Sequence, residues 1–502
     1  MPDKEFGDFQ TPLQLAEQCL GLLMIPDDAR VLEPTCGEGA FLRAAEKAVP
    51  GSERRGLELR QEYVEIASQW GTVEQGNIFE KDLSRDVSWE SDGSLFVVGN
   101  PPWVTSSELG RISSENLPPK ENFKKAKGLD AVLGSSNFDV CEYIILKALT
   151  ELRSERFTLG MLCKTQVARN VMQYASENGL PIAGSEIYRI DALKWFNAGV
   201  DACWFIAVVD PLYAPDYTTD VHDDVFAPGG TPSKRFGVVD GLFVSDVDKY
   251  REVEAADGRS PFVWRSGLKH DASSIFELKA TPAPETKAGQ RLDIEEGYVF
   301  PLLKCTDIFR DRTRELTRWV IVPQRSFGES TEDLAERAPR LSAYLDANAE
   351  ALDRRKSSIY RGRPRFSVFG HGPYTYGRYK VAVSGLHKEA RFRLVAPIDG
   401  KPVVLDDTCY FVPFDRGTEA AVAAALLNSE QAQALIESLV FWDAKRPITK
   451  RLLARLDVGR LPVDDEAIIA SAEEHARAAG VEFDRGVARG FLAELGRSGS
   501  GG

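Results

Sequence analysis

Four consecutive residues, Asn100-Pro101-Pro102-Trp103, constrain this chain most, because they end a buried strand abruptly. The apolar run 95–99 before them is typical of a strand that is covered on both faces. Proline has no N–H to donate, so the backbone must leave the sheet at this point. The Asn100 side chain and the Asn-Pro carbonyl then offer two acceptors beside a flat indole. This arrangement suits a planar ring with an NH2 group, such as adenine; the alternative is an ordinary strand exit with a packed tryptophan.

A strand, a glycine-containing loop and a helix follow one another over residues 30–48. Glycines at such a turn let a ligand approach the backbone, and the helix N-terminus carries a partial positive charge. The pattern has Leu42 where the dinucleotide fingerprint needs Gly or Ala, and it lacks the Gly-Lys-Ser/Thr of a phosphate loop. It therefore favours a ligand with a carboxylate, an amine and an adenosine over a nucleotide phosphate.

Polar residues also end the next two predicted strands. Glu58 lies 19 residues after Gly39, where an acid at a strand end can accept both ribose hydroxyls. The alternative for Glu58 is a solvated acid without a ligand. Asn77 ends the third strand and could bond the amino group of an adenine. Upstream, Thr11-Pro12 is a good helix start, with Thr as the cap and Pro at the first helical position.

Length and composition exclude several classes of protein. The 502 residues suggest about two to four domains, and no apolar run is long enough to span a bilayer. Seven cysteines without a Cys-x-x-Cys pair, and five scattered histidines, indicate a reducing cytoplasm and no metal site. The residue types thus favour a metal-free protein with no membrane segment.

The net charge of −14 conceals a basic region. Residues 231–460 carry about +5, and residues 351–395 hold eleven Lys and Arg against two acids. Basic residues among aromatic residues and glycines fit contacts to nucleic-acid phosphates and grooves, although charge runs are often just solvated faces. A second basic cluster lies in the polar segment 104–137, which follows the tetrad. The DNA-contact candidates are Lys124, Lys125, Arg361, Arg363, Arg365, Arg378 and Lys380.

Together, five segments resemble the S-adenosylmethionine-dependent DNA amino-methyltransferases in order and spacing. The resemblance is greatest to the N6-adenine group with the gamma arrangement, in which the cofactor motif and the tetrad precede a C-terminal target-recognition domain. Asn77 departs from the family, which more often has Asp at this position, but Asn can still accept a hydrogen bond. The five segments are 9–12, 31–41, 56–59, 76–79 and 100–103.

The resemblance implies a role for each matching residue. In the tetrad, Asn100 and the Pro101 carbonyl would bond the target amino group, Pro102 would shape the turn, and Trp103 would stack on the target ring. Phe196, with Trp195 as the second choice, would pack on the flipped base from the hairpin between the last two strands. The implied cofactor-binding residues are Thr11, Pro12, Glu33, Thr35, Cys36, Gly37, Gly39, Phe41, Glu58, Leu59, Asn77, Ile78 and Asn100.

The implied fold is α/β, a doubly wound and mostly parallel seven-stranded sheet followed by a mixed α+β target-recognition domain. We expect a catalytic domain at 1–210, a linker at 211–235, a recognition domain at 236–460 and an acidic helical tail at 461–502. The implied activity is methyl transfer from S-adenosylmethionine to N6 of a flipped-out adenine in double-stranded DNA. A prokaryotic cytoplasm and a separately encoded restriction endonuclease or defence complex fit this activity.

Two rival interpretations stay open. One is transfer to another NH2 group, in cytosine N4, RNA guanine N2 or a protein glutamine. A glutamine enzyme has no need of a large basic domain, and cytosine N4 enzymes more often carry Ser in place of Asn100. The other is a DNA-binding subunit that keeps the fold without catalysis, which the intact tetrad and glycine loop disfavour.

Overall fold

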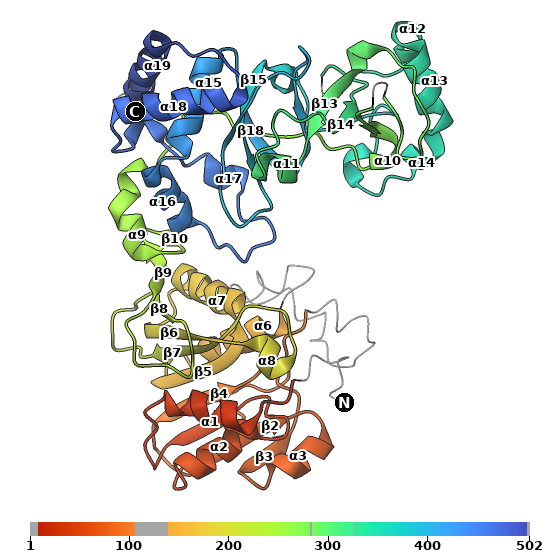
Figure 1. Ribbon diagram of the computed structural model, residues 1–502. Helices are drawn as coiled ribbons and strands as arrows, with labels where there is room; N and C mark the ends of the chain where they lie inside the picture. Colours follow the sequence, from red (N-terminus) through yellow and green to blue (C-terminus); the bar gives the residue numbers. More distant parts are fainter. Residues whose placement is uncertain (1–8, 106–138, 282–283, 327, 499–502) are drawn as a thin grey trace. The chain divides into compact units, whose positions relative to one another are not determined.

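The computed structural model describes residues 9–105, 139–281, 284–326 and 328–498 of the chain (Figure 1). Lys124 and Lys125 lie outside these ranges. The chain divides into two compact units, Met1–Asp248 and Lys249–Gly502.

The first unit contains a sheet with helices on both sides (Figure 1). Its strands are β1 (Arg30–Glu33), β2 (Glu53–Glu58), β3 (Thr72–Gln75), β4 (Leu95–Gly99), β5 (Phe157–Lys164), β6 (Ile182–Ile190), β7 (Ala202–Val209), β8 (Thr218–His222), β9 (Lys234–Val239) and β10 (Leu242–Val244). Its helices are α1 (Leu13–Gly21), α2 (Ala40–Ala48), α3 (Gln61–Ala67), α6 (Val140–Glu151), α7 (Thr165–Asn178) and α8 (Ala192–Phe196), with α9 (Val247–Val253) at the junction of the two units.

The strand order is β10-β9-β8-β6-β7-β5-β4-β1-β2-β3. β1 and β4 are parallel neighbours; β2 and β3 continue the sheet on one side, whereas β5 follows β4 on the other. The direction of winding therefore reverses between β1 and β4. In sheets of this kind, ligands bind beyond the carboxyl ends of the strands that flank this switch point.

The expected doubly wound α/β fold is confirmed, and all seven expected strands end by residue 209. The sheet is larger than expected, because β8 pairs in parallel with β6, and β9 and β10 extend that edge. Residues 211–235, expected to be a linker, thus include a strand of the sheet. Only Thr219 and Val221 of β8 are buried. The polar residues between them hide the alternation from a sequence-based search.

Buried apolar residues explain why the centre of this sheet forms. All five residues of β4 are buried, as are seven of the eight residues of β7. Phe41 of α2 stacks on Trp204 of β7 with ring centroids 5.4 Å apart, which fixes the helix against the sheet. Asp139 begins α6 by accepting a hydrogen bond from the Cys141 N–H, as helix caps do. This packing holds the strand ends that carry the site.

The second unit contains two four-stranded sheets, β11-β18-β15-β16 and β12-β14-β13-β17. Their strands are β11 (Arg265–Ser266), β12 (Glu277–Lys279), β13 (Val299–Leu303), β14 (Arg318–Ile321), β15 (Tyr379–Ser384), β16 (Arg393–Val395), β17 (Val404–Leu405) and β18 (Cys409–Phe414). The helices are α10 (Ser273–Phe276), α11 (Cys305–Phe309), α12 (Leu334–Arg337), α13 (Pro339–Ala347), α14 (Ala349–Asp353), α15 (Gly417–Leu427), α16 (Glu430–Leu439), α17 (Lys450–Leu453), α18 (Asp465–Ala479) and α19 (Arg485–Ser498).

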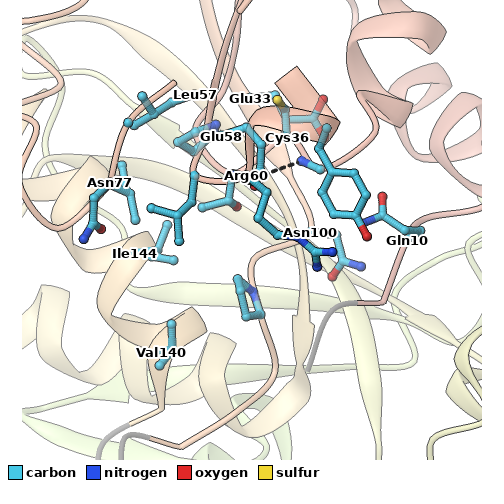
Figure 2. A pocket seen from close by; sticks show the side chains of 18 of the residues that line it. Gln10, Glu33, Cys36, Leu57, Glu58, Arg60, Asn77, Asn100, Val140 and Ile144 are labelled. Carbon is cyan, nitrogen blue, oxygen red and sulfur yellow. Dashed lines mark hydrogen bonds between the residues drawn. The ribbon is translucent and has the colours of Figure 1, made fainter. Parts of the chain in front are cut away.

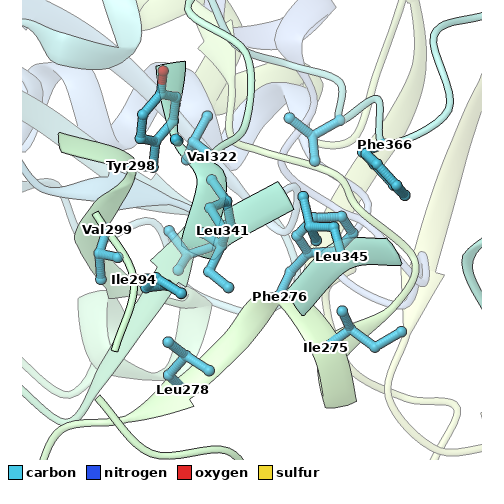
Figure 3. Packing of buried hydrophobic residues seen from close by; sticks show 14 of the residues in the cluster. Ile275, Phe276, Leu278, Ile294, Tyr298, Val299, Val322, Leu341, Leu345 and Phe366 are labelled. Atoms are coloured by element: carbon cyan, nitrogen blue, oxygen red, sulfur yellow. The ribbon is translucent and has the colours of Figure 1, made fainter. Parts of the chain in front are cut away.

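Two parts of this unit have cores of their own. Leu341 and Leu345 of α13 pack with Phe276 of α10 and with Val299 and other apolar residues of the β12-β14-β13-β17 sheet (Figure 3). α15 is buried over nearly its whole length and contacts β15, β16 and β18. The helical C-terminal region, 461–502, contributes α18 and α19, and both helices also contact α15.

Candidate active site

A cavity of about 410 Å³ lies at the carboxyl ends of β1 to β4 (Figure 2). Its volume is within the range of small-molecule sites, about 300–1,000 Å³. Eleven of the predicted site residues line it: Thr11, Glu33, Thr35, Cys36, Gly37, Glu58, Leu59, Asn77, Ile78, Asn100 and Pro102. The structure therefore brings together residues from five separate sequence segments at the expected switch point.

The loop from Cys36 to Gly39 forms one wall of this cavity, and its glycines are required by geometry. Gly37 and Gly39 have φ angles of +51° and +80°, which side chains rarely tolerate. A Cβ at Gly37 would also lie 2.7 Å from Oε1 of Gln10. Burial raises the pKa of the Cys36 thiol, so this cysteine is not an activated nucleophile.

Two carboxylates hold this wall in place. Glu58 at the end of β2 accepts hydrogen bonds from the Gly37 and Arg60 backbone N–H groups, each at 2.9 Å. Glu33 at the end of β1 is buried and accepts from the Leu42 N–H at 3.1 Å. Burial raises the pKa of Glu33 well above its usual range, although the hydrogen bonds from α2 act in the opposite direction. Both side chains thus anchor the loop and the start of α2.

The tetrad begins where β4 ends. The Asn100 Nδ2 donates to the Phe9 carbonyl at 3.0 Å, while its Oδ1 is buried and has no partner among the residues that the structure describes. Trp103 is also buried, and its Nε1 donates to the Leu162 carbonyl at 3.3 Å. Pro102 lines the cavity beside Asn100, and Pro101 is buried. An unsatisfied buried acceptor costs free energy unless a ligand pairs with it.

Two aromatic rings, those of Phe9 and Phe196, adjoin Trp103 of the tetrad. Phe196, at the end of α8, lies 5.2 Å from Trp103 between ring centroids, and Phe9 lies 5.9 Å from each of them. Trp195 instead stacks on Phe226 at 5.6 Å. Phe196 therefore belongs to the tetrad's surroundings and Trp195 does not. Because Trp103 and Phe196 are 6% and 7% exposed, a ring that stacked on Trp103 would have to part them.

Some predicted cofactor residues stand behind the cavity wall. Phe41 is fully buried against Trp204 and belongs to the core of the sheet. Gly39 precedes α2, and the Pro12 carbonyl accepts from the first turn of α1. Asn77 lines the cavity, with its Oδ1 accepting from the Phe79 N–H at 3.0 Å.

Several lining residues were missed by the sequence analysis: Phe9, Gln10, Arg60, Tyr63, Val140 and Ile144. Gln10 could have been found from its place beside Thr11. The Arg60 guanidinium lies 4.3 Å from the centre of the Tyr63 ring, a pairing that i and i+3 spacing on a helix start permits. Val140 and Ile144 are on α6, and no local pattern connects them with the site.

The basic region of the second unit, residues 351–395, is partly exposed. Arg361, Arg363, Arg365 and Arg378 are exposed, and Arg365 pairs with Asp353 at 2.9 Å. Lys380, in contrast, is 1% exposed and donates to the Gly377 carbonyl at 2.7 Å. Burial lowers its pKa to about 7. The prediction of a DNA contact by Lys380 is therefore wrong, because β15 is an interior strand between β16 and β18 and is buried from Lys380 to Ser384.

Arg355 holds the basic segment to its surroundings. Its guanidinium donates to the carbonyls of Ser367 at 2.7 Å and of His270 and Arg365 at 3.2 Å. It also lies 3.8 Å from the centre of the Tyr360 ring. One half-buried cation, Arg355, thus joins both ends of the segment that carries Arg361 and Arg363.

Over the described residues, no group of three or more His, Cys, Asp or Glu side chains is arranged to hold a metal ion. Within the same ranges, no helix is long and apolar enough to cross a membrane.

The doubly wound sheet with a cavity at its switch point defines a class of α/β proteins that bind ligands beyond the carboxyl ends of the strands. The chain is 37% identical over 469 residues to the type II methyltransferase M.NspV of Nostoc sp. (strain ATCC 29411 / PCC 7524). The match covers 90% of this chain and 96% of that protein. The chain therefore belongs to the type II methyltransferase family, and the predicted S-adenosylmethionine-dependent methyltransferase class is confirmed. No protein-family model matches the chain.

Solved structures also match this fold. The type IIL restriction-modification enzyme MmeI, solved in complex with DNA, matches with a TM-score of 0.51 and 10% identity, over 99% of this chain and 76% of that one. At this identity the match bears on the fold alone. A modification subunit of a putative type I restriction enzyme from Vibrio vulnificus YJ016 has a TM-score of 0.30 and 14% identity over 45% of this chain and 49% of that one, too low to carry an argument.

Proposed function

We propose that this protein transfers a methyl group from S-adenosylmethionine to N6 of adenine at a specific site in double-stranded DNA. The observation that carries the proposal is the buried Oδ1 of Asn100 at the edge of the cavity, which has no partner among the residues that the structure describes. An acceptor in this position is suited to an amino group. The neighbouring Pro101 carbonyl supplies the second acceptor that an NH2 group needs.

The cavity fits the cofactor in chemistry and size. S-adenosylmethionine supplies an electrophilic methyl group on a sulfonium. Gly37 lines the cavity, and Glu58 lies where ribose hydroxyls would bond it. Asn77 and Ile78 border the side toward β3, where they hold the adenine of the cofactor. Thr11 and Thr35 hold the methionine end.

The residues of the tetrad account for activation of the target. The N6 of adenine is a weak nucleophile because its lone pair is delocalised into the ring. Two acceptors that hold both N6 hydrogens draw the nitrogen toward tetrahedral geometry and free the lone pair. Catalysis then consists of positioning and electrostatics, without a thiol or a metal.

The target base must leave the duplex to reach this site, which costs a few kcal/mol of unstacking. Trp103 and Phe196 provide the apolar surfaces that offset this cost once they part around the base. The flat ring of adenine fits between two aromatic side chains. This step assigns Phe196 to the target and leaves Trp195 outside the site.

DNA is the substrate that the relatives and the charge distribution favour. M.NspV is a type II methyltransferase, and MmeI was solved with DNA bound. In this chain the exposed Arg361, Arg363 and Arg378 provide phosphate or groove contacts. The first unit, Met1–Asp248, then carries catalysis, and the second unit, Lys249–Gly502, carries target recognition, with the tail as part of it.

A restriction-modification system is the setting that fits this activity. In that setting the methyl groups protect host sites in a prokaryotic cytoplasm from an endonuclease on another chain. Co-expression tests this partner: cells with the cognate endonuclease survive only when they carry this methyltransferase.

Transfer of a labelled methyl group tests the proposed chemistry. The purified chain is incubated with duplex DNA and methyl-labelled S-adenosylmethionine, and the DNA is digested to nucleosides. The proposal predicts label in N6-methyl-2′-deoxyadenosine only. Label in N4-methyl-2′-deoxycytidine, or transfer to RNA or protein but not to DNA, would contradict it.

A further inference from the structure

The side-chain amide of Asn100 can adopt two nearly isosteric orientations, and only one of them suits the proposed reaction. With Oδ1 toward the target, the amide accepts a hydrogen from N6. With Nδ2 toward the target, a donor would face a donor. Something in the protein must therefore select the orientation.

The Phe9 carbonyl makes this selection. It is an acceptor only, and it lies 3.0 Å from Nδ2 of Asn100. The amide nitrogen is committed to Phe9, so Oδ1 faces the other way, and it has no partner within the described part of the chain. Figure 2 shows Asn100 at the edge of the cavity, near Gln10.

The backbone around Phe9 is tied to the cofactor loop. Gln10 Oε1 accepts from the Glu38 N–H at 3.0 Å and lies against Gly37. Thr11 lines the cavity, and the Pro12 carbonyl receives the first hydrogen bonds of α1. The Phe9 ring packs against Trp103 and Phe196. Three adjacent residues thus contact the tetrad, the glycine loop and the cavity wall.

We propose that residues 9–11 form a positioning strap, in which the Phe9 carbonyl fixes the Asn100 amide with its oxygen toward the target amino group. The proposal rests on the proposed function for the identity of the target. It makes Phe9 a positioning residue that acts through its backbone, and it makes Gln10 the contact that joins the strap to the cofactor loop.

The Asn100→Asp variant tests the orientation. An ionised carboxylate would place an oxygen against the Phe9 carbonyl oxygen, which is unfavourable. Only the protonated carboxyl can donate to Phe9 while its other oxygen accepts from the target. The charged side chains that line the same cavity are Glu33, Glu58 and Arg60, and they are common to variant and wild type.

We expect the turnover of Asn100→Asp to rise about tenfold for each pH unit of acidification between pH 8 and pH 6, as the protonated fraction does. Wild-type turnover is measured in parallel and is expected to change less than about threefold. A flat profile for the variant, whether active or inactive, would overturn the proposal.

Thermal unfolding gives a readout that needs no transfer. The melting temperature of Asn100→Asp relative to wild type should fall by at least about 2 °C more at pH 8 than at pH 4, because only the ionised carboxylate repels the Phe9 carbonyl. Asn77→Asp is the matched control, because its carboxylate would still accept from the Phe79 N–H. If the difference in melting temperature between Asn100→Asp and wild type is the same at both pH values, the proposed strap is wrong.

The two proposals fail in distinguishable ways. If wild-type protein methylates DNA but the Asn100→Asp variant shows neither pH effect, the strap is wrong and the proposed function stands. If wild-type protein transfers nothing to DNA while the pH-dependent stability gap is present, the proposed function is wrong and the strap stands.

Discussion

Asn100 has two polar groups with different partners, and this division makes it the most specific single residue of the site. Its nitrogen is used by Phe9, whereas its oxygen awaits a ligand. We expect Asn100→Ala to lower turnover at least about 100-fold, the usual cost of losing a group that stabilises a transition state. Cofactor affinity, measured by calorimetry, should change by only a few fold. Unchanged turnover would remove the tetrad from the mechanism.

Gly37 shows how one backbone position controls cofactor access. We expect Gly37→Ala to destabilise the fold by about 1–2 kcal/mol and to weaken cofactor binding at least tenfold, because of its positive φ and the nearby Gln10. Urea unfolding and cofactor titration measure the two effects. Gly21→Ala is the control, since a Cβ there meets nothing within 4 Å. Equal effects of the two substitutions would contradict the assigned role of Gly37.

At the scale of elements, the segment 354–366 depends on Arg355. Replacing Arg355 by Met leaves several buried carbonyls unpaired and should release the segment, so its amides exchange faster and DNA binding weakens. Hydrogen exchange of residues 357–364 and the salt dependence of the DNA affinity measure the two consequences. The slope of log affinity against log salt should become shallower.

Arg354→Met is the matched control for this prediction. The substitution removes the same charge from the adjacent position. The Arg354 side chain is 75% exposed, and among the ion pairs of the described residues it pairs only with Glu350. We expect it to leave hydrogen exchange unchanged. If Arg354→Met and Arg355→Met alter binding and exchange equally, charge alone matters and Arg355 does not hold the segment.

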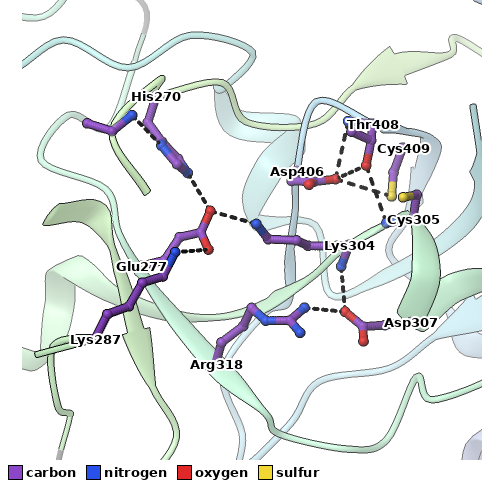
Figure 4. Close-up of polar contacts among 11 residues, drawn as sticks. His270, Glu277, Lys287, Lys304, Cys305, Asp307, Arg318, Asp406, Thr408 and Cys409 are labelled. Carbon is purple, nitrogen blue, oxygen red and sulfur yellow. Dashed lines mark hydrogen bonds and ion pairs between the residues drawn. The ribbon is translucent and has the colours of Figure 1, made fainter. Parts of the chain in front are cut away.

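Another element-scale prediction concerns Glu277 of β12 (Figure 4). Its buried carboxylate lies 2.7 Å from Lys304 Nζ and 3.2 Å from His270 Nε2. Burial alone would raise the pKa of Glu277, but these partners outweigh it and lower the pKa from 4.5 to about 2. Because the pKa of this carboxyl is lower in the folded protein, its ionisation stabilises the fold at pH values above the ordinary pKa of Glu. This stabilisation is lost as the pH falls toward 2.

We therefore expect the local stability of β12 and β14 to fall by about 3 kcal/mol between pH 5 and pH 2, as measured by hydrogen exchange. Glu277→Gln should be less stable at pH 7 and should lose most of this acid dependence. Glu350→Gln, at an 81% exposed side chain, should keep it. Full acid dependence in Glu277→Gln would contradict the role of this carboxylate.

For the whole molecule, the sequence predicted best what depends on local chemistry. The glycine loop, Glu58 and Asn100 were found because strand ends, positive-φ glycines and proline stops have short-range signatures. The order of these segments along the chain predicted one switch point in the sheet. The ends of the strands meet there and line one cavity. The class of fold followed from the same alternation of strands and helices.

What the sequence did not predict depends on tertiary packing. Phe41 follows the glycine loop, but the face of α2 on which it lies is directed to Trp204. Lys380 belongs to a basic run, yet it is buried in β15, an interior strand that is covered on both faces. Val140 and Ile144 reach the cavity from a helix far along the chain. None of these outcomes leaves a pattern in neighbouring residues.

Modification-detecting sequencing of genomic DNA is the most direct test of the central claim. The DNA comes from cells that express this chain alone, with cells that express Asn100→Ala as the control. The account predicts N6-methyladenine in one short sequence context in the first sample and none in the second. Absence of N6-methyladenine from the first sample, or equal modification in both, would contradict it.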